Sequence, residues 1–227
     1  MNKLNHVAFI MDGNGRWGIK KKKNRNFGHL QGVKTVQKVV EYSMKLKIPI
    51  VTFYVFSTEN WKRPKKEIKF LFSLINSYFK KEIKNVINNG IRINILGKIE
   101  QLPENLKKNL KKTLKRTKFN KKLIVNLALN YGSKKEIVDT IIKLRKKKTN
   151  ITEHSISKNL YTKNLANPDI LIRTGGQKRL SNFMLWQLAY AEFYFLEKLW
   201  PDFNESDLKK IIRDYSSITR NFGTVND

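Results

Sequence analysis

One short segment restricts the fold more than any other feature of the chain. Residues 50–56 (IVTFYVF) place apolar side chains on both faces that a strand would have. Strands that are buried on both faces occur mainly in parallel sheets covered by helices on each side. The segment therefore predicts a central strand of a parallel sheet in an α/β domain.

Segments of strand and helix character alternate along the rest of the chain. Further strands are predicted at residues 6–10, 91–96, 123–129, 169–172 and 192–195. Helices are predicted at residues 29–47, 64–88, 103–118, 134–147, 183–190 and 207–220. Residues 151–165 are predicted as a short helix and loop, with Thr152 as N-cap but without a capping box. The alternation predicts a single domain over residues 1–227, with a mostly parallel sheet of about six strands covered by helices.

Composition narrows the class of protein. The chain has 227 residues, of which 40% are hydrophobic, as expected for one globular domain. It contains no cysteine, which excludes disulfides and thiolate chemistry. No apolar run is long enough to span a bilayer, and the N-terminus lacks the core of a signal peptide, so we expect a cytoplasmic protein.

The net charge of +29 suggests nucleic-acid binding as an alternative function, which would be steeply salt-dependent. Most of the basic residues are lysines, however, and this bias is what a skewed coding composition would produce. We interpret the lysine runs 20–23 and 146–148 as solvated ends of loops and helices, and expect no nucleic-acid partner. A basic surface would still attract polyanionic ligands such as diphosphates.

Polar loops follow four of the predicted strands. The first, residues 11–17 (MDGNGRW), combines one carboxylate with two glycines, an Asn, an Arg and a Trp; the others are residues 57–63, 130–133 and 173–181. Because ligands of parallel α/β sheets bind at the carboxyl ends of strands, we expect these loops to converge on one crevice. The predicted crevice residues are Asp12, Asn14, Arg16, Arg25, His29, Ser57, Asn60, Arg63, Arg173, Arg179 and Ser181.

This crevice would hold one acid among many groups that bind phosphate. Asp12 is a hard oxygen ligand suited to Mg²⁺, with Glu192 as a second candidate, and the arginines offer planar forks for phosphate oxygens. The chain has neither a P-loop nor a G-x-S-x-G motif. A diphosphate ester is therefore the favoured ligand. The alternative is an ordinary strand-to-helix turn in which Asp12 has no chemical role.

Apolar side chains accompany these polar groups. Trp17, Phe27 and Trp61 lie in the loops, and the helix predicted at residues 64–88 carries two apolar stripes. The second stripe consists of Phe70, Leu74 and Tyr78. It predicts an apolar cavity, a partner surface or a helix buried on two sides. A diphosphate site beside an apolar cavity points to a prenyl substrate, with other phosphoryl or nucleotide ligands as alternatives.

Five segments resemble the cis-prenyltransferases in the same order, from about residue 6 to residue 223. They are residues 6–17, 56–64 (FSTENWKRP), 130–132 (NYG), 169–183, with RTGGQKRLSNF at its end, and 186–202. Residues 220–223 are similar to a C-terminal element of the family. Trans-prenyltransferases depend on D-D-x-x-D motifs, and this chain has no Asp-Asp pair. The resemblance implies an α/β fold with an apolar tunnel that receives the growing chain.

The resemblance also implies an activity. Farnesyl diphosphate would be extended by repeated addition of isopentenyl diphosphate with cis double bonds, giving undecaprenyl diphosphate, a lipid carrier precursor for peptidoglycan and other cell-wall polymers. A product of different length is the alternative. Mg²⁺ would be the cofactor. The partners would be a second copy of the chain in a homodimer and, transiently, the inner face of the membrane.

The implied roles divide the site in two. Asp12 would bind Mg²⁺ and help the allylic diphosphate to leave, while that diphosphate and its chain would be held by Gly13, Asn14, Gly15, Arg16, Trp17, Arg25 and His29. Isopentenyl diphosphate would be held by Arg173, Arg179, Leu180 and Ser181, and the reacting carbons would lie near Ser57, Thr58, Glu59, Asn60, Trp61 and Arg63. Asn60 would position or relay the departing proton. Glu192 would complete the metal site, from the other subunit of the dimer. Lys178 stands where close relatives can have His.

Overall fold

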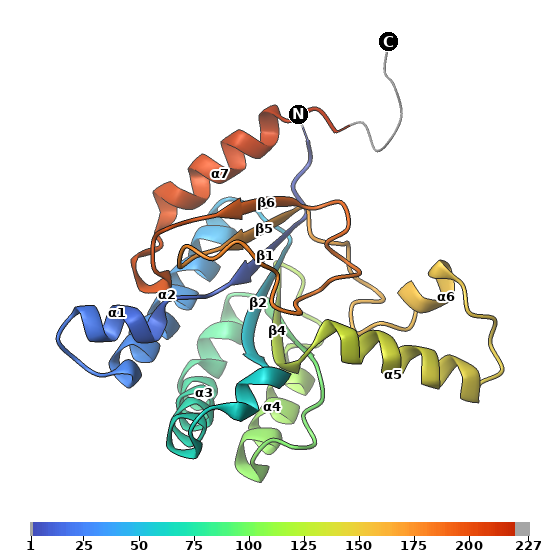
Figure 1. Cartoon of the computed structure of the whole chain (residues 1–227), viewed down its shortest axis with the longest axis horizontal. Coiled ribbons are helices and arrows are strands. Elements are labelled where there is room, and N and C mark those ends of the chain that lie inside the picture. The colour runs from blue at the N-terminus through green and yellow to red at the C-terminus, as the bar shows by residue number, and fades with distance from the viewer. Residues whose placement is uncertain (1, 221–227) are drawn as a thin grey trace.

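In a computed structural model, which describes residues 2–220, the chain forms one six-stranded sheet in the order β3-β4-β2-β1-β5-β6. All neighbouring strands run parallel, as the alternation of elements predicts. The strands are β1 (His6–Ile10), β2 (Ile50–Ser57), β3 (Ile91–Leu96), β4 (Leu123–Tyr131), β5 (Ile170–Arg173) and β6 (Glu192–Phe195). The apolar segment that predicts a central strand lies in β2, between β1 and β4 (Figure 1).

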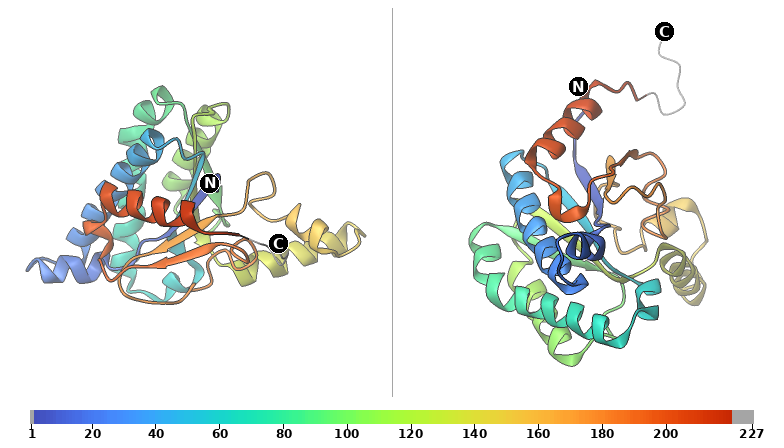
Figure 2. Two further views of the ribbon diagram at one scale, coloured as in Figure 1. Left: turned by 90° about the horizontal axis from the view of Figure 1, so that it is seen from above. Right: turned by 60° about the vertical axis from the view of Figure 1, so that its left-hand side comes forward.

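The helices connect these strands and cover the sheet unequally. They are α1 (Asn14–Lys20), α2 (Arg25–Lys45), α3 (Lys65–Asn88), α4 (Glu104–Thr117), α5 (Ser133–Lys146), α6 (Glu153–Ser157) and α7 (Glu205–Ser217), with 3₁₀ turns η1 (Thr58–Lys62) and η2 (Trp200–Asp202). One face packs against α2, α3, α4 and α7. The other is covered mainly by irregular backbone around residues 183–188, while α5 and α6 extend away from the remaining helices (Figures 1 and 2). The expected helical cover is therefore complete on one face only.

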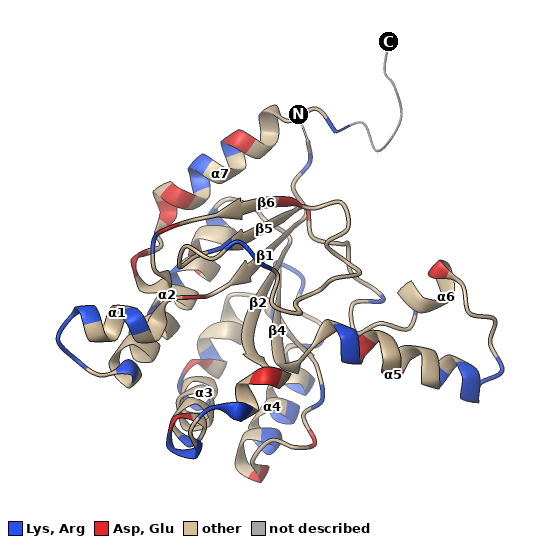
Figure 3. Cartoon of the chain, in the orientation of Figure 1, with Lys and Arg blue, Asp and Glu red and all other residues tan. Residues whose placement is uncertain are grey.

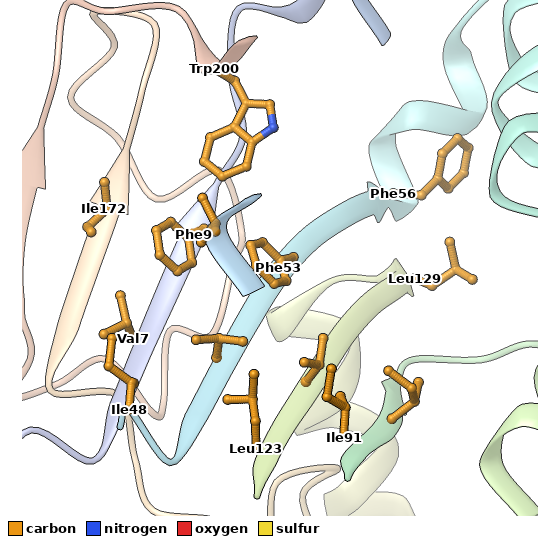
Figure 4. Packing of buried hydrophobic residues seen from close by; sticks show 14 of the residues in the cluster. Val7, Phe9, Ile48, Phe53, Phe56, Ile91, Leu123, Leu129, Ile172 and Trp200 are labelled. Carbon is orange, nitrogen blue, oxygen red and sulfur yellow. The ribbon is translucent and has the colours of Figure 1, made fainter. Parts of the chain in front are cut away.

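An aromatic cluster joins the centre of the sheet to η2. The rings of Phe9 on β1 and Phe53 on β2 stack with centroids 5.1 Å apart, and the indole of Trp200 meets both rings edge-on (Figure 4). The Trp200 indole N–H donates a hydrogen bond to the carbonyl oxygen of Gly32 in α2 at 3.0 Å. Its backbone N–H donates to the carbonyl oxygen of Asp12, also at 3.0 Å. Asp12, two residues beyond the end of β1, is therefore anchored to the core.

Three local predictions need correction. Residues 14–20 form helix α1 rather than a loop, because Gly13 takes a left-handed N-cap conformation (φ 107°) that turns the chain directly from β1 into a helix. Residues 183–190 form turns rather than a helix, since Ser181, Asn182 and Met184 all have positive φ. Thr152 does form a capping box, with Ser155, in which each side chain accepts a hydrogen bond from the other's backbone N–H.

Two helix boundaries also differ. The second helix begins at Arg25, because the Asn24 side chain caps it by accepting from the Phe27 N–H at 2.9 Å. The last helix starts earlier and ends at Ser217, with a capping box between Asn204 and Asp207. The element at residues 220–223 that resembles the family's C-terminus lies almost wholly outside the described residues. Among residues 2–220, no helix combines the length and apolar character that crossing a membrane requires.

Candidate active site

A polar cleft of about 680 Å³ opens at the carboxyl ends of β1, β2 and β5. It is lined by most of the predicted crevice residues: Asp12, Asn14, His29, Ser57, Asn60, Arg63, Arg173, Arg179 and Ser181. A smaller pocket of about 120 Å³ continues from it and adds Arg16 and Arg25. The prediction that loops distant in sequence converge here is confirmed for three of the four. The fourth loop, residues 130–133, is not among the described lining residues of the cleft. Its Asn130 accepts a hydrogen bond from the indole of Trp61 at 2.8 Å.

Asp12 is held by arginines on two sides. Its Oδ2 accepts a hydrogen bond from Arg173 Nη2 at 2.9 Å, and its Oδ1 accepts one from Arg16 Nη2 at 3.2 Å. Its backbone carbonyl oxygen accepts from Thr174 Oγ1 at 2.8 Å as well as from Trp200. The carboxylate is thus fixed at the cleft wall, with 29% of the side chain still exposed. Such a group can hold one side of a hydrated cation.

A metal at Asp12 would find few other ligands in the same chain. Within residues 2–220, no three His, Asp or Glu side chains gather as a protein-built metal site requires. Mg²⁺ commonly binds through one or two carboxylates together with waters and substrate phosphates. The Asp12 carboxylate among phosphate-binding groups therefore fits Mg²⁺ that arrives with a diphosphate, rather than an ion caged by the protein.

Arg173 organises the loop that follows β5. It is buried, and its Nη1 donates hydrogen bonds to the carbonyl oxygen of Arg179 and, at 2.8 Å, to Ser181 Oγ. Gly175 has a φ of 89°, and a Cβ there would lie 2.5 Å from Nη2 of Arg16. The loop therefore folds back so that Arg179 and Ser181 reach the cleft, while the exposed side chains of Lys178 and Arg179 remain accessible to an anion.

Asn60 lies at the cleft with its carbonyl group already engaged. Its Oδ1 accepts the Ser57 backbone N–H at 3.1 Å, and Ser57 Oγ accepts the Asn60 N–H at 3.2 Å, which forms the capping box of η1. The side-chain NH₂ of Asn60 is the group left to meet a ligand. An amide NH₂ only donates, so Asn60 can orient a substrate but cannot take up a proton.

Three residues that line the smaller pocket share a carboxylate neighbour that the sequence analysis missed. Glu67, in the first turn of α3, lies 3.4 Å from Arg25, 3.2 Å from Arg63 and 3.6 Å from His29 Nε2. Burial and the neighbouring charge of Arg63 lower the pKa of His29 to about 4. His29 is therefore neutral at physiological pH, and the positive charge of the pocket comes from arginines.

Several predicted site residues lie outside the described lining of the cleft and the pocket. Trp17 stacks on Phe27 with centroids 5.8 Å apart and donates from its indole to Asp202 at 2.7 Å. Thr58 hydrogen-bonds to Glu59 at 3.1 Å, and Glu59, which does line the cleft, accepts from Asn182 at 2.8 Å. Leu180 packs under the second face of the sheet, and Trp61 packs against Phe72.

Glu192 lies at the other end of the sheet from Asp12. It is the first residue of β6 and pairs in register with Ile170, whereas Arg173, the Asp12 partner, pairs with Phe195 at the other end. Because the strands are parallel, Glu192 is at the amino ends and Asp12 is beyond the carboxyl ends. One copy of the chain therefore does not bring the two predicted metal ligands together.

An apolar cavity of about 140 Å³ extends from the cleft between the sheet and helices α2 and α3. It shares five lining residues with the cleft: Met11, Asn14, His29, Val55 and Leu71. The second stripe of α3 contributes Leu74 and Tyr78 to the cavity wall, whereas Phe70 is not among its lining residues. The apolar cavity that the second stripe predicts is thus present, and it adjoins the polar cleft.

The glycines 13, 15 and 18 match the G-x-G-x-x-G spacing of dinucleotide-binding loops, after a strand and within a helix. In this structure, each of the three glycines has a structural reason other than dinucleotide binding. Gly13 turns the chain into α1, and a Cβ on Gly15 would lie 2.7 Å from the Arg25 guanidinium. A Cβ on Gly18 would lie 2.3 Å from the Asn24 carbonyl oxygen, so its absence lets α1 pack on α2.

The basic residues form no single stripe. Lys and Arg are distributed over α1, α3, α4, α5 and α7 on several sides of the molecule (Figure 3). This distribution supports the interpretation of the lysine excess as a bias of composition. The arginines, in contrast, gather at one place, where five of them line the cleft and the smaller pocket.

A polar cleft lined by arginines that opens into an apolar cavity is the arrangement expected of an enzyme that transfers prenyl groups. The family model described as "Putative undecaprenyl diphosphate synthase" matches residues 10–223, and the chain belongs to this prenyltransferase family. It is 46% identical to an isoprenyl transferase of Fusobacterium nucleatum, over 97% of this chain and 96% of that one. It is 45% identical to an isoprenyl transferase of Halalkalibacterium halodurans, over 97% and 89% of the two chains.

Two solved structures share the fold. Lavandulyl diphosphate synthase from Lavandula x intermedia, in complex with dimethylallyl diphosphate, matches with a TM-score of 0.91 and 32% identity, over 96% of this chain and 98% of that one. A probable undecaprenyl diphosphate synthase from Campylobacter jejuni matches with a TM-score of 0.85 and 36% identity, over 99% and 100%. The resemblance of the sequence to cis-prenyltransferases is confirmed.

Proposed function

We propose that this isoprenyl transferase extends farnesyl diphosphate with successive molecules of isopentenyl diphosphate to give undecaprenyl diphosphate, the carrier precursor for peptidoglycan and other cell-wall polymers. The observation that carries the proposal is the continuity of the polar cleft with the apolar cavity, which share five residues. A diphosphate held in the cleft would direct its hydrocarbon chain into the cavity. The reaction would take place in the cytoplasm, with transient contact at the inner face of the membrane when the product leaves.

The smaller pocket is the better candidate for the allylic diphosphate. It places Gly13, Asn14, Gly15, Arg16, Arg25, His29 and Arg63 around one small volume beside Asp12. Arginine forks can bind several phosphate oxygens at once and stabilise the charge that develops on the leaving diphosphate. Mg²⁺ bound to Asp12 would neutralise part of that charge.

The loop after β5 would hold isopentenyl diphosphate. Arg179 and Ser181 line the cleft, and Arg173 fixes both the Arg179 backbone and the Ser181 hydroxyl. Asn60 would orient the reacting carbons through its NH₂ group. Since that group only donates, the proton lost in each condensation would pass to the departing diphosphate.

Glu192 enters this scheme only through a second copy of the chain. β6 is an edge strand, and the Phe193 side chain on it is 43% exposed. An edge strand with an exposed aromatic side chain is suited to an interface between copies. A homodimer built there would let Glu192 of one copy complete the metal site at Asp12 of the other.

A turnover assay tests the proposal. Labelled isopentenyl diphosphate, farnesyl diphosphate and Mg²⁺ are incubated with the wild type and Asp12→Ala, and product length is read by chromatography. We expect long polyprenyl products from the wild type, no turnover with EDTA, and a loss of about 100-fold or more in Asp12→Ala with an unchanged circular dichroism spectrum. Near-normal activity of the variant would refute the metal role of Asp12. A product of different length from the wild type would refute undecaprenyl diphosphate as the product.

A further inference from the structure

Glu67 is the common partner of three side chains that face the allylic diphosphate pocket. Its Oε1 lies 3.2 Å from Arg63 Nη1 and 3.6 Å from His29 Nε2, and its Oε2 lies 3.4 Å from Arg25 Nε. These partners come from the start of α2 and from the residue after η1, so Glu67 joins three separate elements at the entrance of α3. Only 12% of the Glu67 side chain is exposed.

The carboxylate is ionised in this setting. Burial alone would raise the pKa of Glu67, but the hydrogen bond from Arg25 and the charges of Arg25 and Arg63 outweigh it, so the pKa is lower than usual. Without this negative charge, the guanidinium groups of Arg25 and Arg63 would face each other unscreened in a partly buried space. Like charges at close range would then separate.

Glu67 itself does not line the pocket or the cleft as these are described, whereas Arg25 and Arg63 do line the pocket. The Arg25 guanidinium also packs close to Gly15, where an added Cβ would lie 2.7 Å from it. Both the backbone of Gly15 and the carboxylate of Glu67 therefore restrict the guanidinium, although 53% of the Arg25 side chain is exposed. A group fixed in this way loses little entropy when it binds an anion.

We propose that Glu67 is a positioning residue that holds Arg25 and Arg63 in the geometry that binds the allylic diphosphate. The inference rests on the proposed function for the identity of the substrate. Isopentenyl diphosphate would be held by the loop after β5, which Glu67 does not contact in the described structure. Loss of Glu67 should therefore affect one of the two substrates selectively.

Steady-state kinetics of Glu67→Gln and Glu67→Asp test this inference. Gln keeps the size of the side chain without its charge, and Asp keeps the charge on a shorter stem. In Glu67→Gln we expect KM for the allylic diphosphate to rise about tenfold and KM for isopentenyl diphosphate to stay within about threefold. Glu67→Asp should recover part of the loss. Glu104→Gln is the matched control, because Glu104 also lies in the first turn of a helix after a proline and pairs with Lys107 at 2.6 Å, but it is exposed.

Two readouts separate positioning from simple loss of stability. Thermal unfolding is measured for every variant, and binding of inorganic diphosphate is measured by calorimetry, which needs no turnover. We expect weaker diphosphate binding in Glu67→Gln even where its unfolding temperature equals that of Glu104→Gln. If the wild type fails to condense the two substrates, the proposed function fails, and diphosphate binding still decides the role of Glu67. Equal changes in both KM values, or unchanged diphosphate binding, would overturn the inference.

Discussion

Arg173, the last residue of β5, donates a hydrogen bond at 2.9 Å to Oδ2 of Asp12, which lies two residues beyond the end of the neighbouring strand β1. The same guanidinium reaches Ser181 and the Arg179 backbone, so one buried side chain connects the proposed metal ligand to the proposed isopentenyl diphosphate loop. The Arg173 guanidinium therefore connects the two halves of the candidate site, in addition to the hydrogen bond from Thr174 Oγ1 to the Asp12 carbonyl oxygen.

Replacing Arg173 by lysine should remove this connection while keeping the positive charge at position 173. An ammonium group cannot make the same planar set of hydrogen bonds to Asp12, Ser181 and a carbonyl oxygen at once. We expect kcat to fall by about tenfold or more and KM for isopentenyl diphosphate to rise. Arg145→Lys, an exposed change on α5, should leave both unchanged. Wild-type kinetics in Arg173→Lys would show that positive charge alone suffices.

The substitution Leu74→Trp should shorten the product. Leu74 lines the apolar cavity, and a larger ring there would reduce the space for the growing chain. Chromatography of the products from labelled isopentenyl diphosphate provides the measurement. Phe70→Trp is the matched control on the same helix, since Phe70 is not among the described lining residues. The tunnel assignment fails if both variants make products of wild-type length.

Mixing two inactive variants should test whether Glu192 acts across a dimer. Asp12→Ala and Glu192→Ala would each disable both sites of their own homodimer. After unfolding and refolding together, half of the dimers would be mixed and would contain one intact site, so activity should return to about a quarter of wild type. Each variant refolded alone is the control. No recovery in the mixture would argue against a shared metal site.

The stability of the protein should decrease in mild acid because of His6. Its Nδ1 lies 2.7 Å from the Ala166 carbonyl oxygen and its Nε2 lies 2.6 Å from Thr52 Oγ1. Burial lowers the pKa of His6 to about 4, although the hydrogen bond to Ala166 and the charge of Asp169 act in the opposite direction. Between pH 6.5 and 4, the unfolded chain therefore binds a proton that the folded chain does not.

The free energy of unfolding should accordingly fall as the pH drops through this window, by up to roughly 1.4 kcal/mol per pH unit from this group. Urea denaturation at pH 7 and pH 5 measures the difference. We expect it to shrink in His6→Gln and to persist in His154→Gln, because His154 is exposed on α6. The pKa of His29 is also lowered, so His29 will contribute part of the pH dependence of stability in both variants.

The sheet could be predicted because each strand is specified by a short continuous segment of the sequence. Continuous apolar runs such as residues 50–56 specify buried parallel strands, and the polar loops after them mark one edge of the sheet. Helix α1 was missed because residues 13–18 contain three glycines, which disfavour a helix interior. The tertiary packing of α1 against α2 overrides that propensity.

The rest of the site depends on contacts between segments far apart in sequence. Glu67 follows Arg63 at helical spacing, and this i, i+4 pair was a usable signal, but its contacts with Arg25 and His29 exist only in the folded chain. Residues 183–190 have a helical apolar pattern, yet the positive φ of Ser181, Asn182 and Met184 lets the same side chains pack as turns. Short apolar runs do not distinguish these outcomes.

The irregular segment after β5 has a consequence for interpreting variants. Its first half presents Arg179 and Ser181 to the cleft, and a few residues later Phe183, Met184 and Leu188 form much of the core on that face of the sheet. A screen that scores enzyme activity alone would therefore merge two kinds of defect in one stretch of sequence. Abundance and substrate affinity must be scored separately there, since a truncation of Phe183 that loosens the core would also displace the side chains proposed to bind the substrate.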